Sequence, residues 1–174
     1  DYTAAGEALT LPGMAGTFTL RPHQRAAVAR MIAEPAVGLF HEVGAGKTLE
    51  MVAGTMELKR LGLVSKPAVV VPNHMLRQFT REWLQAYPNA QLLAAGSNDI
   101  SNATARRKFV SRVAANDWDA VVMTQGAFKS LGVTPETESA YLAAQVATTR
   151  EFLEQAREAG LSDRSIKQVE KSVL

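Results

Sequence analysis

Short apolar runs alternate with longer stretches of helical periodicity through the middle of the chain. The runs contain few charged residues and have the length of buried strands, whereas the stretches between them repeat apolar residues about every three or four positions. Because strands that alternate with helices are joined as β-α-β units, this pattern predicts an α/β fold with a parallel sheet flanked by helices. The expected strands are 36–40, 68–71, 91–94 and 119–123, and the expected helices are 22–34, 47–61, 75–86 and 102–115.

The two ends of the chain have a different character. Residues 1–19 are small and polar without sustained periodicity, so they are expected to form a loosely held lead-in. From Thr134 a favourable helix start is followed by apolar residues at helical spacing on both sides of Gly160, which predicts a helical hairpin. The expected organisation is the lead-in, an incomplete α/β lobe at 20–133 and a truncated helical segment at 134–174. We interpret the last segment as a structural insertion, with a partner-binding or DNA-contacting arm as the alternative.

A glycine-rich motif of the pattern Gly-x-Gly-Lys-Thr lies between the predicted strand 36–40 and the helix that follows it. Glycines let successive backbone N–H groups curl toward a phosphate, and the amino end of the helix adds positive charge. Lys47 would then contact the terminal phosphates, and the Thr48 hydroxyl would coordinate a magnesium ion. The alternative is a glycine-rich turn with a surface lysine. His41 stands where the full pattern has glycine, which argues against the loop of a typical nucleotide kinase or small GTPase.

This loop resembles the corresponding loop of Swi/Snf-type and DEAD/DEAH-related superfamily-two motors, which commonly carry an acidic or polar residue in place of that first glycine. Upstream, residues 20–24 are similar to the Leu-Arg-Pro-aromatic-Gln signature of the family, with His23 in place of the aromatic residue. The resemblance implies that Gln24 reads the adenine edge through its amide, the alternative being an exposed position on a first helical turn. The nucleotide-binding residues that it implies are Arg21, Gln24, His41, Glu42, Val43, Gly44, Ala45, Gly46, Lys47 and Thr48, with Lys47 and Thr48 also in the catalytic role.

Two strand ends further along resemble the nucleic-acid motifs of the same family. Residues 69–73 are similar to its second motif, in which the end of a strand and the start of a helix contact the nucleic-acid backbone. Residues 121–125 resemble the strand and threonine that come next. The resemblance therefore implies that Pro72, Asn73 and Thr124 contact phosphates, although a plain strand-to-helix turn would have a similar pattern.

The resemblance covers about residues 18–130 and implies the N-terminal RecA-like lobe of a helicase or translocase, similar in overall look to large helicase-like proteins of phages and mobile elements. It implies ATP and Mg²⁺ as cofactors, and as partners DNA, favoured over RNA, and a second RecA-like lobe of the same full-length chain. The sequence lacks the Asp-Glu pair with which family members hydrolyse ATP, so the chain alone is expected to bind ATP weakly without turning it over. A degenerate interaction module on the same loop and a phosphotransferase remain as alternatives.

Composition narrows this picture a little. The 174 residues include no cysteine, which excludes disulfides and cysteine-based zinc sites and favours the cytoplasm. Because no apolar run is long enough to cross a bilayer, no membrane partner is expected. The start at Asp1 and the apolar residues at the other end predict a piece of a larger protein. The net charge of +2 does not by itself indicate nucleic-acid binding.

Histidine, tryptophan and basic residues outside the loop are assigned structural roles. His41 and His74 have no carboxylate or cysteine neighbours at ligand spacing along the sequence, so a metal site is not expected. Trp83 and Trp118 are expected to pack in the core. A basic cluster is interpreted as a solvated helix face, with phosphate contacts as the alternative. The cluster consists of Arg106, Arg107, Lys108 and Arg112, and the residues expected to face the core beside it are Phe109, Val110, Val113 and Ala114.

Overall fold

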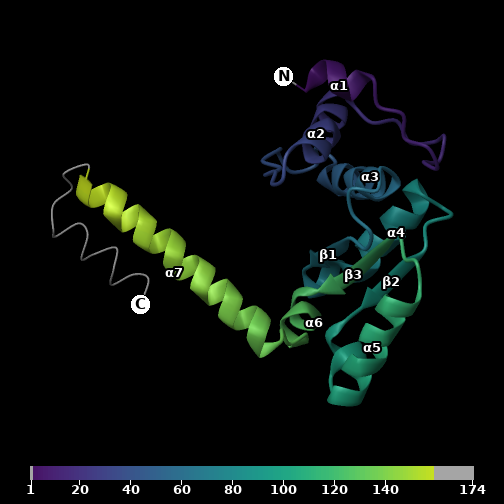
Figure 1. The fold of residues 1–174 in the computed structure, drawn as a ribbon. Coiled ribbons are helices and arrows are strands. Elements are labelled where there is room, and N and C mark those ends of the chain that lie inside the picture. The colour runs from purple at the N-terminus through teal and green to yellow at the C-terminus, as the bar shows by residue number, and fades with distance from the viewer. Residues whose placement is uncertain (1, 159–174) are drawn as a thin grey trace. The chain divides into compact units, whose positions relative to one another are not determined.

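The computed structural model describes residues 2–158 of the chain, which divides into two compact units, Asp1–Leu131 and Gly132–Leu174. The first unit contains the sheet and its surrounding helices, and the described part of the second contains one long helix (Figure 1). The elements in chain order are α1 (Thr3–Glu7), α2 (Pro22–Ala33), α3 (Lys47–Arg60), β1 (Ala68–Val71), η1 (Asn73–Met75), α4 (Leu76–Ala86), β2 (Leu92–Ala95), η2 (Ser97–Ile100), α5 (Ala103–Ala115), β3 (Ala120–Thr124), α6 (Gln125–Ser130) and α7 (Pro135–Glu158).

The sheet of the first unit has three parallel strands in the order β1-β3-β2. In the central strand β3, Val122 pairs with Val69 of β1, and Val121 pairs with Leu93 of β2. Every residue of β3 is buried, as is typical of a parallel strand that is covered on both faces. The structure thus confirms the predicted α/β fold with a parallel sheet flanked by helices.

Alternate residues of β3 belong to separate apolar clusters on the two faces of the sheet. Ala120 and Val122 pack with residues of α3 and α4 on one face. Val121 and Met123 pack with residues of η2, α5 and α6 on the other. Because successive side chains of a strand point to opposite faces, a single buried strand connects both halves of the core.

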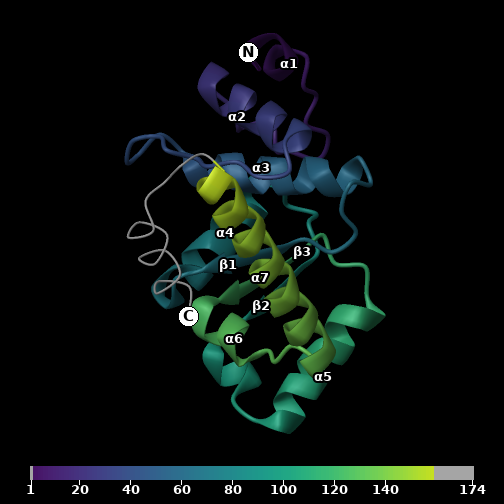
Figure 2. The same ribbon diagram turned by 60° about the vertical axis from the view of Figure 1, so that its left-hand side comes forward.

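The helices α1 and α2 form a further layer on the side of α3 that faces away from the sheet (Figures 1 and 2). Val28 of α2 is fully buried in a cluster with Ala53 of α3. Gly6 of α1 lies so close to α2 that an added Cβ would be 2.8 Å from the carbonyl carbon of Arg25. The Arg25 Nε also donates a hydrogen bond to the Gly6 carbonyl at 2.8 Å. The expectation of a loosely held lead-in is therefore wrong for α1, which packs firmly against α2.

Residues 36–40 do not form the strand that their apolar sequence predicts. The structure describes them as loop, and Phe40 is 96% exposed. A strand is stable only as one side of a hydrogen-bonded ladder. Within residues 2–158, β3 pairs with β1 and β2, and no strand pairs with 36–40. The glycine-rich loop therefore follows an irregular segment rather than a strand.

The helices predicted around the sheet are confirmed. The expected segments 47–61, 75–86 and 102–115 correspond to α3, α4 and α5 within a few residues. Trp83 of α4 is fully buried in the core, as expected. Trp118 packs against the cluster on the α5 face, and its indole N–H donates to the carbonyl of Arg112. Sequence periodicity therefore located these helices, while the expectation of core packing holds fully for Trp83 and only in part for Trp118, which is partly buried.

The described part of the second unit consists mainly of α7. The Thr134 hydroxyl oxygen accepts a hydrogen bond from the Thr137 backbone N–H at 3.3 Å, which is consistent with the helix start predicted there. The second helix of the predicted hairpin falls in residues 159–174, which lie outside the described residues. None of the helices between residues 2 and 158 is long and apolar enough to cross a membrane.

Candidate functional site

The glycine-rich loop ends where α3 begins. Gly44 and Gly46 have φ angles of 85° and 89°, in the left-handed region that favours glycine. The Ala45 N–H donates to the Glu42 carbonyl at 3.2 Å and closes the turn. Gly46 is the N-cap of α3, so the positive amino end of this helix lies at the loop. These are the backbone features that an anion-binding loop requires.

Lys47 is the first residue of α3, and its side chain lies back over the loop. The Nζ donates hydrogen bonds to the carbonyls of His41 at 2.7 Å and Glu42 at 2.9 Å. These contacts keep the ammonium group beside the turn, where rotation of a flexible side chain can bring it to an anion. Thr48 follows in the first turn of α3 and is half-buried.

Gln24 connects the start of α2 to the loop. It is only 4% exposed, and its Nε2 donates to the carbonyls of Ala45 at 3.2 Å and Gly46 at 3.3 Å. Its Oε1 accepts a hydrogen bond from the Arg21 backbone N–H at 2.8 Å. Gln24 is therefore a buried residue that holds the loop, not an exposed position on a helical turn. Whether it also reads a nucleotide base stays a prediction.

A buried carboxylate that sequence reasoning did not single out lies next to the loop. Glu50 of α3 is 0% exposed, and its two oxygens lie 2.9 and 3.1 Å from Nδ1 of His41. His41 has no carboxylate at ligand spacing along the sequence, which is why no metal site was expected there, but the loop and the first turn of α3 bring Glu50 beside it. The Nε2 of His23 lies 3.8 Å from the nearer Glu50 oxygen and 3.1 Å from the Ala45 carbonyl oxygen. The sequence offered one signal for this contact, because Glu50 is a charged residue at a position of α3 that faces the core.

The residues predicted to contact nucleic acid lie at the carboxyl ends of β1 and β3. Pro72 and Asn73 follow β1, and the register places the end of β1 beside Thr124. Thr124 is buried, and its hydroxyl oxygen accepts from the Ala127 N–H at 3.2 Å as the N-cap of α6. A Cβ at Gly126 would come 3.8 Å from the Asn73 side-chain oxygen, so Asn73 lies beside the first turn of α6, which Thr124 caps. The Thr124 hydroxyl already has a structural partner there.

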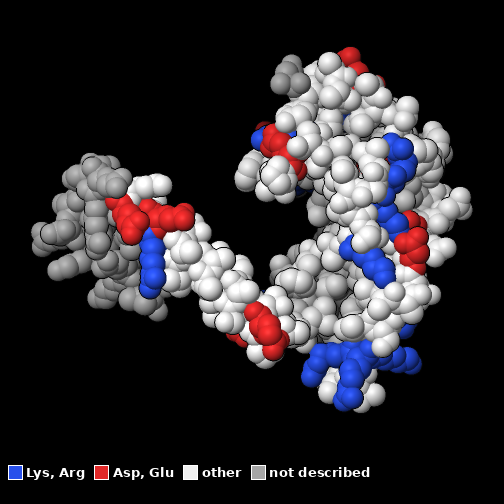
Figure 3. All heavy atoms as spheres, viewed as in Figure 1, with Lys and Arg blue, Asp and Glu red and all other residues white. Residues whose placement is uncertain are grey.

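The basic residues of α5 form a positively charged face, which Figure 3 shows as a cluster of Lys and Arg side chains. Arg107, Lys108 and Arg112 are exposed, as predicted for a solvated helix face. Fewer residues of α5 face the core than the sequence predicted. Phe109 and Val113 pack against the sheet, but Val110 and Ala114 are exposed, because α5 buries only one stripe against the sheet.

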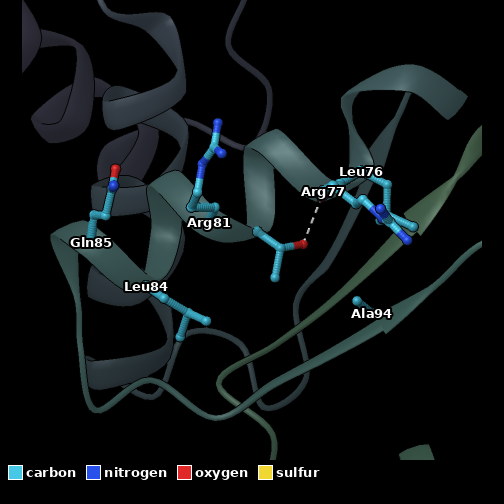
Figure 4. Close-up of a pocket in the computed structure, with 7 residues that line it drawn as sticks. Leu76, Arg77, Arg81, Leu84, Gln85 and Ala94 are labelled. Atoms are coloured by element: carbon cyan, nitrogen blue, oxygen red, sulfur yellow. Dashed lines mark hydrogen bonds between the residues drawn. The ribbon is translucent and has the colours of Figure 1, made fainter.

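A shallow groove of about 500 Å³ lies between α4 and β2 (Figure 4). The Thr80 hydroxyl donates to the Leu76 carbonyl at 2.8 Å, so it is satisfied within its own helix. The lining of the groove is mainly apolar and includes two arginines of α4. Its lining consists of Leu76, Arg77, Thr80, Arg81, Leu84, Gln85 and Ala94.

The fold and the loop define an α/β protein in which a glycine-rich turn ends at the amino end of a helix and carries a lysine over it. The chain belongs to the family of probable helicase domains, whose sequence pattern matches residues 31–173. It is therefore a helicase-related protein. No curated protein matches it.

Proposed function

We propose that this chain is the ATP-binding lobe of a nucleic-acid-dependent ATPase, a helicase or translocase of the superfamily-two, Swi/Snf-related kind. The observation that carries the proposal is the loop at the amino end of α3, with two glycines in the left-handed conformation and Lys47 lying over the turn. Membership of a helicase-domain family makes a nucleotide the expected ligand of such a loop.

The residues of the loop fit a magnesium nucleotide. The first N–H groups of a helix have no acceptor inside the helix, so those at the start of α3 can donate to phosphate oxygens. Lys47 would exchange its carbonyl acceptors at His41 and Glu42 for oxygens of the terminal phosphates. The Thr48 hydroxyl would ligate Mg²⁺, which neutralises charge on the phosphates. The loop would thus hold the nucleotide chiefly through its phosphates.

Gln24 is proposed to act at both the loop and the base. Its amide nitrogen donates hydrogen bonds to the carbonyl oxygens of Ala45 and Gly46. If this nitrogen donated to adenine instead, one of these two hydrogen bonds would be broken. This would make the conformation of the loop sensitive to the base that is bound. The remaining residues proposed around the nucleotide are Arg21, His41, Glu42, Val43 and Gly44.

We further propose that DNA lies along the carboxyl ends of β1 and β3. Pro72 and Asn73 contribute the end of β1, and Thr124 contributes the end of β3. Arg77 and Arg81 of α4 add positive charge nearby in sequence and line the groove of Figure 4. Phosphate contacts from such residues would make binding weaker as salt is added.

Hydrolysis is proposed to need groups that this sequence does not contain. No Asp-Glu pair occurs in the chain, and such a pair would hold magnesium and orient the attacking water. A second RecA-like lobe would supply arginines that stabilise charge on the transferred phosphate. We therefore expect this chain to bind ATP without hydrolysing it.

A non-enzymatic interaction module is the second candidate, and one observation favours it. Within its own unit, α7 leaves several large apolar side chains exposed, and apolar surface of this kind is typical of docking sites. The exposed residues are Tyr141, Leu142, Val146 and Phe152.

Calorimetric titration of magnesium-ATP into the chain and into Lys47→Ala tests the main proposal. We expect saturable binding by the parent and at least a tenfold loss in the variant, because about 1.4 kcal/mol corresponds to a factor of ten and hydrogen bonds to charged groups contribute about 1.5–3 kcal/mol. The matched control is Lys129→Ala, which removes an exposed lysine of α6. Equal binding by parent and Lys47→Ala, or no binding by the parent, would contradict the assignment of the loop.

A further inference from the structure

We infer that His23, His41 and Glu50 form a binding site for a divalent transition-metal ion of the zinc type, separate from the magnesium of the proposed nucleotide. The three side chains come from the first turn of α2, from the loop and from α3. Each offers one ligand atom, and these atoms all lie within 4.8 Å of one another. The inference rests on this cluster alone and does not depend on ATP binding.

The distances in the cluster suit a single small ion. Nδ1 of His41 lies 2.9 Å from Oε1 of Glu50, and Nε2 of His23 lies 3.8 Å from the same oxygen. A tetrahedral ion with bonds of about 2.0–2.1 Å separates its ligand atoms by about 3.3 Å. The two separations from Glu50 lie on either side of this value, and no two of the three ligand atoms are more than 4.8 Å apart, so side-chain rotations would be needed to bring all three to bonding distance.

The donor set also selects the class of metal. Two imidazole nitrogens and one carboxylate oxygen are typical ligands of zinc and of neighbouring transition metals, whereas magnesium and calcium prefer oxygen ligands alone. Three protein ligands would leave a fourth coordination position free, and one of the three, His23, has a side chain that is 40% exposed to solvent. A water molecule or a ligand atom can occupy such a position.

The burial of Glu50 gives an independent reason to expect a cation. A carboxylate that is 0% exposed is costly unless charge and hydrogen bonds compensate for the lost hydration. Among the described residues, the Glu50 carboxylate contacts His41 and lies 3.8 Å from the Nε2 of His23, while Lys47 donates to backbone carbonyls. A divalent ion between His23, His41 and Glu50 would supply the missing positive charge directly.

A bound ion would also link the elements around the loop. His41 carries the metal-facing imidazole, and its backbone carbonyl accepts from Lys47. His23 lies 3.1 Å from the carbonyl oxygen of Ala45. Because its ligands come from α2, from the loop and from α3, the ion would link these three segments. Metal binding should therefore raise the thermal stability of the chain.

Titration with Co²⁺ and with Zn²⁺, each as the metal alone and without nucleotide, tests this site on the full chain. Co²⁺ in a tetrahedral nitrogen and oxygen site gives visible absorption bands, so we expect bands that saturate at one equivalent and that Zn²⁺ displaces. Calorimetry with Zn²⁺ should show the same stoichiometry, and an excess of Mg²⁺ should not compete.

Ligand variants decide the assignment. Glu50→Gln and His41→Ala should each weaken metal binding by at least about tenfold, since even the loss of outer partners of metal ligands has effects of this size. His74→Ala, which removes the exposed histidine of η1, is the matched control and should bind as the parent does. If Glu50→Gln and His41→Ala do not fold, as judged by circular dichroism, His23→Ala provides the test, because the His23 side chain is 40% exposed. Absence of saturable bands in the parent, or unchanged binding in the folded ligand variants, would overturn the proposal.

Discussion

Gly46 combines two requirements that only glycine meets. Its φ angle is 89°, and an added Cβ would lie 2.3 Å from the Nε2 of Gln24, which is itself buried and bonded to the loop. Gly44 has a similar φ of 85° but has open space around its missing side chain. The two positions therefore separate the effect of backbone strain from that of contact with Gln24.

We predict that Gly46→Ala lowers the free energy of unfolding more than Gly44→Ala does. Both variants incur the cost of about 1–2 kcal/mol for an alanine in the left-handed region, but only the first also displaces Gln24. Urea denaturation of the two variants measures the difference. Equal losses would show that Gln24 moves away at little cost and does not hold the loop.

The buried side chain of Tyr87 makes the stability of the protein depend on pH. Burial, with a smaller contribution from the Glu57 carboxylate, raises the pKa of Tyr87 to about 12. Its hydroxyl has no hydrogen-bond partner among the described residues. The folded state holds the phenolic proton more tightly than the unfolded state. The contribution of the protonated Tyr87 to the free energy of unfolding is therefore fully present below about pH 10 and is lost as the pH rises toward 12.

We predict that Tyr87→Phe reduces this alkaline loss of stability, because it removes the group that must ionise inside the core. The measurement is the free energy of unfolding of parent and variant between pH 9 and about pH 11.5. Tyr141→Phe, at an exposed tyrosine of α7, is the control and should follow the parent. A Tyr87→Phe curve parallel to that of the parent would contradict the role of burial.

Reasoning from the sequence singled out the glycine-rich turn and Lys47 as a candidate site, and their role in nucleotide binding stays a prediction, but it did not single out Glu50. The loop residues are contiguous, so their spacing alone indicates phosphate chemistry. Glu50 meets His41 and His23 only after α2, the loop and α3 have packed together. A pairing of this kind depends on tertiary contacts, which no local pattern contains.

Among the elements, the segment 36–40 and strand β3 show what an apolar run does and does not predict. Both are short and apolar, but β3 has a neighbour on each side, whereas Phe40 is almost fully exposed. Hydrophobicity indicates that a segment can be buried, while strand formation needs a partner for its backbone groups. The sequence therefore predicted three of the strands and misassigned 36–40.

The junction of β3 and α6 leads to a further prediction. Thr124 ends the strand and caps the helix through its hydroxyl, so Thr124→Ala should lower the free energy of unfolding by about 1 kcal/mol. Thr124→Ser keeps the capping oxygen and should retain most of the stability. Chemical denaturation distinguishes the two. Equal destabilisation by both variants would mean that packing of the threonine methyl group matters more than the cap.

For the whole molecule, periodicity predicted the class of fold but not the order of its strands. Alternating strand and helix patterns suffice to indicate parallel β-α-β units. The order β1-β3-β2 is decided by tertiary contacts of the central strand. Val122 of β3 packs in the apolar cluster on one face of the sheet, and Val121 packs in the cluster on the other face. Such contacts join residues that are distant in the sequence.

The central position of β3 has a consequence for synthesis of the chain on the ribosome. β1 and β2 are made first, yet they are not neighbours, and the strand that separates them ends only at Thr124. A nascent chain that stops short of this residue has two strands without a common partner and two half-formed apolar faces. We therefore expect the sheet to assemble in one late step, and the emerging polypeptide to depend on chaperones until that step is complete.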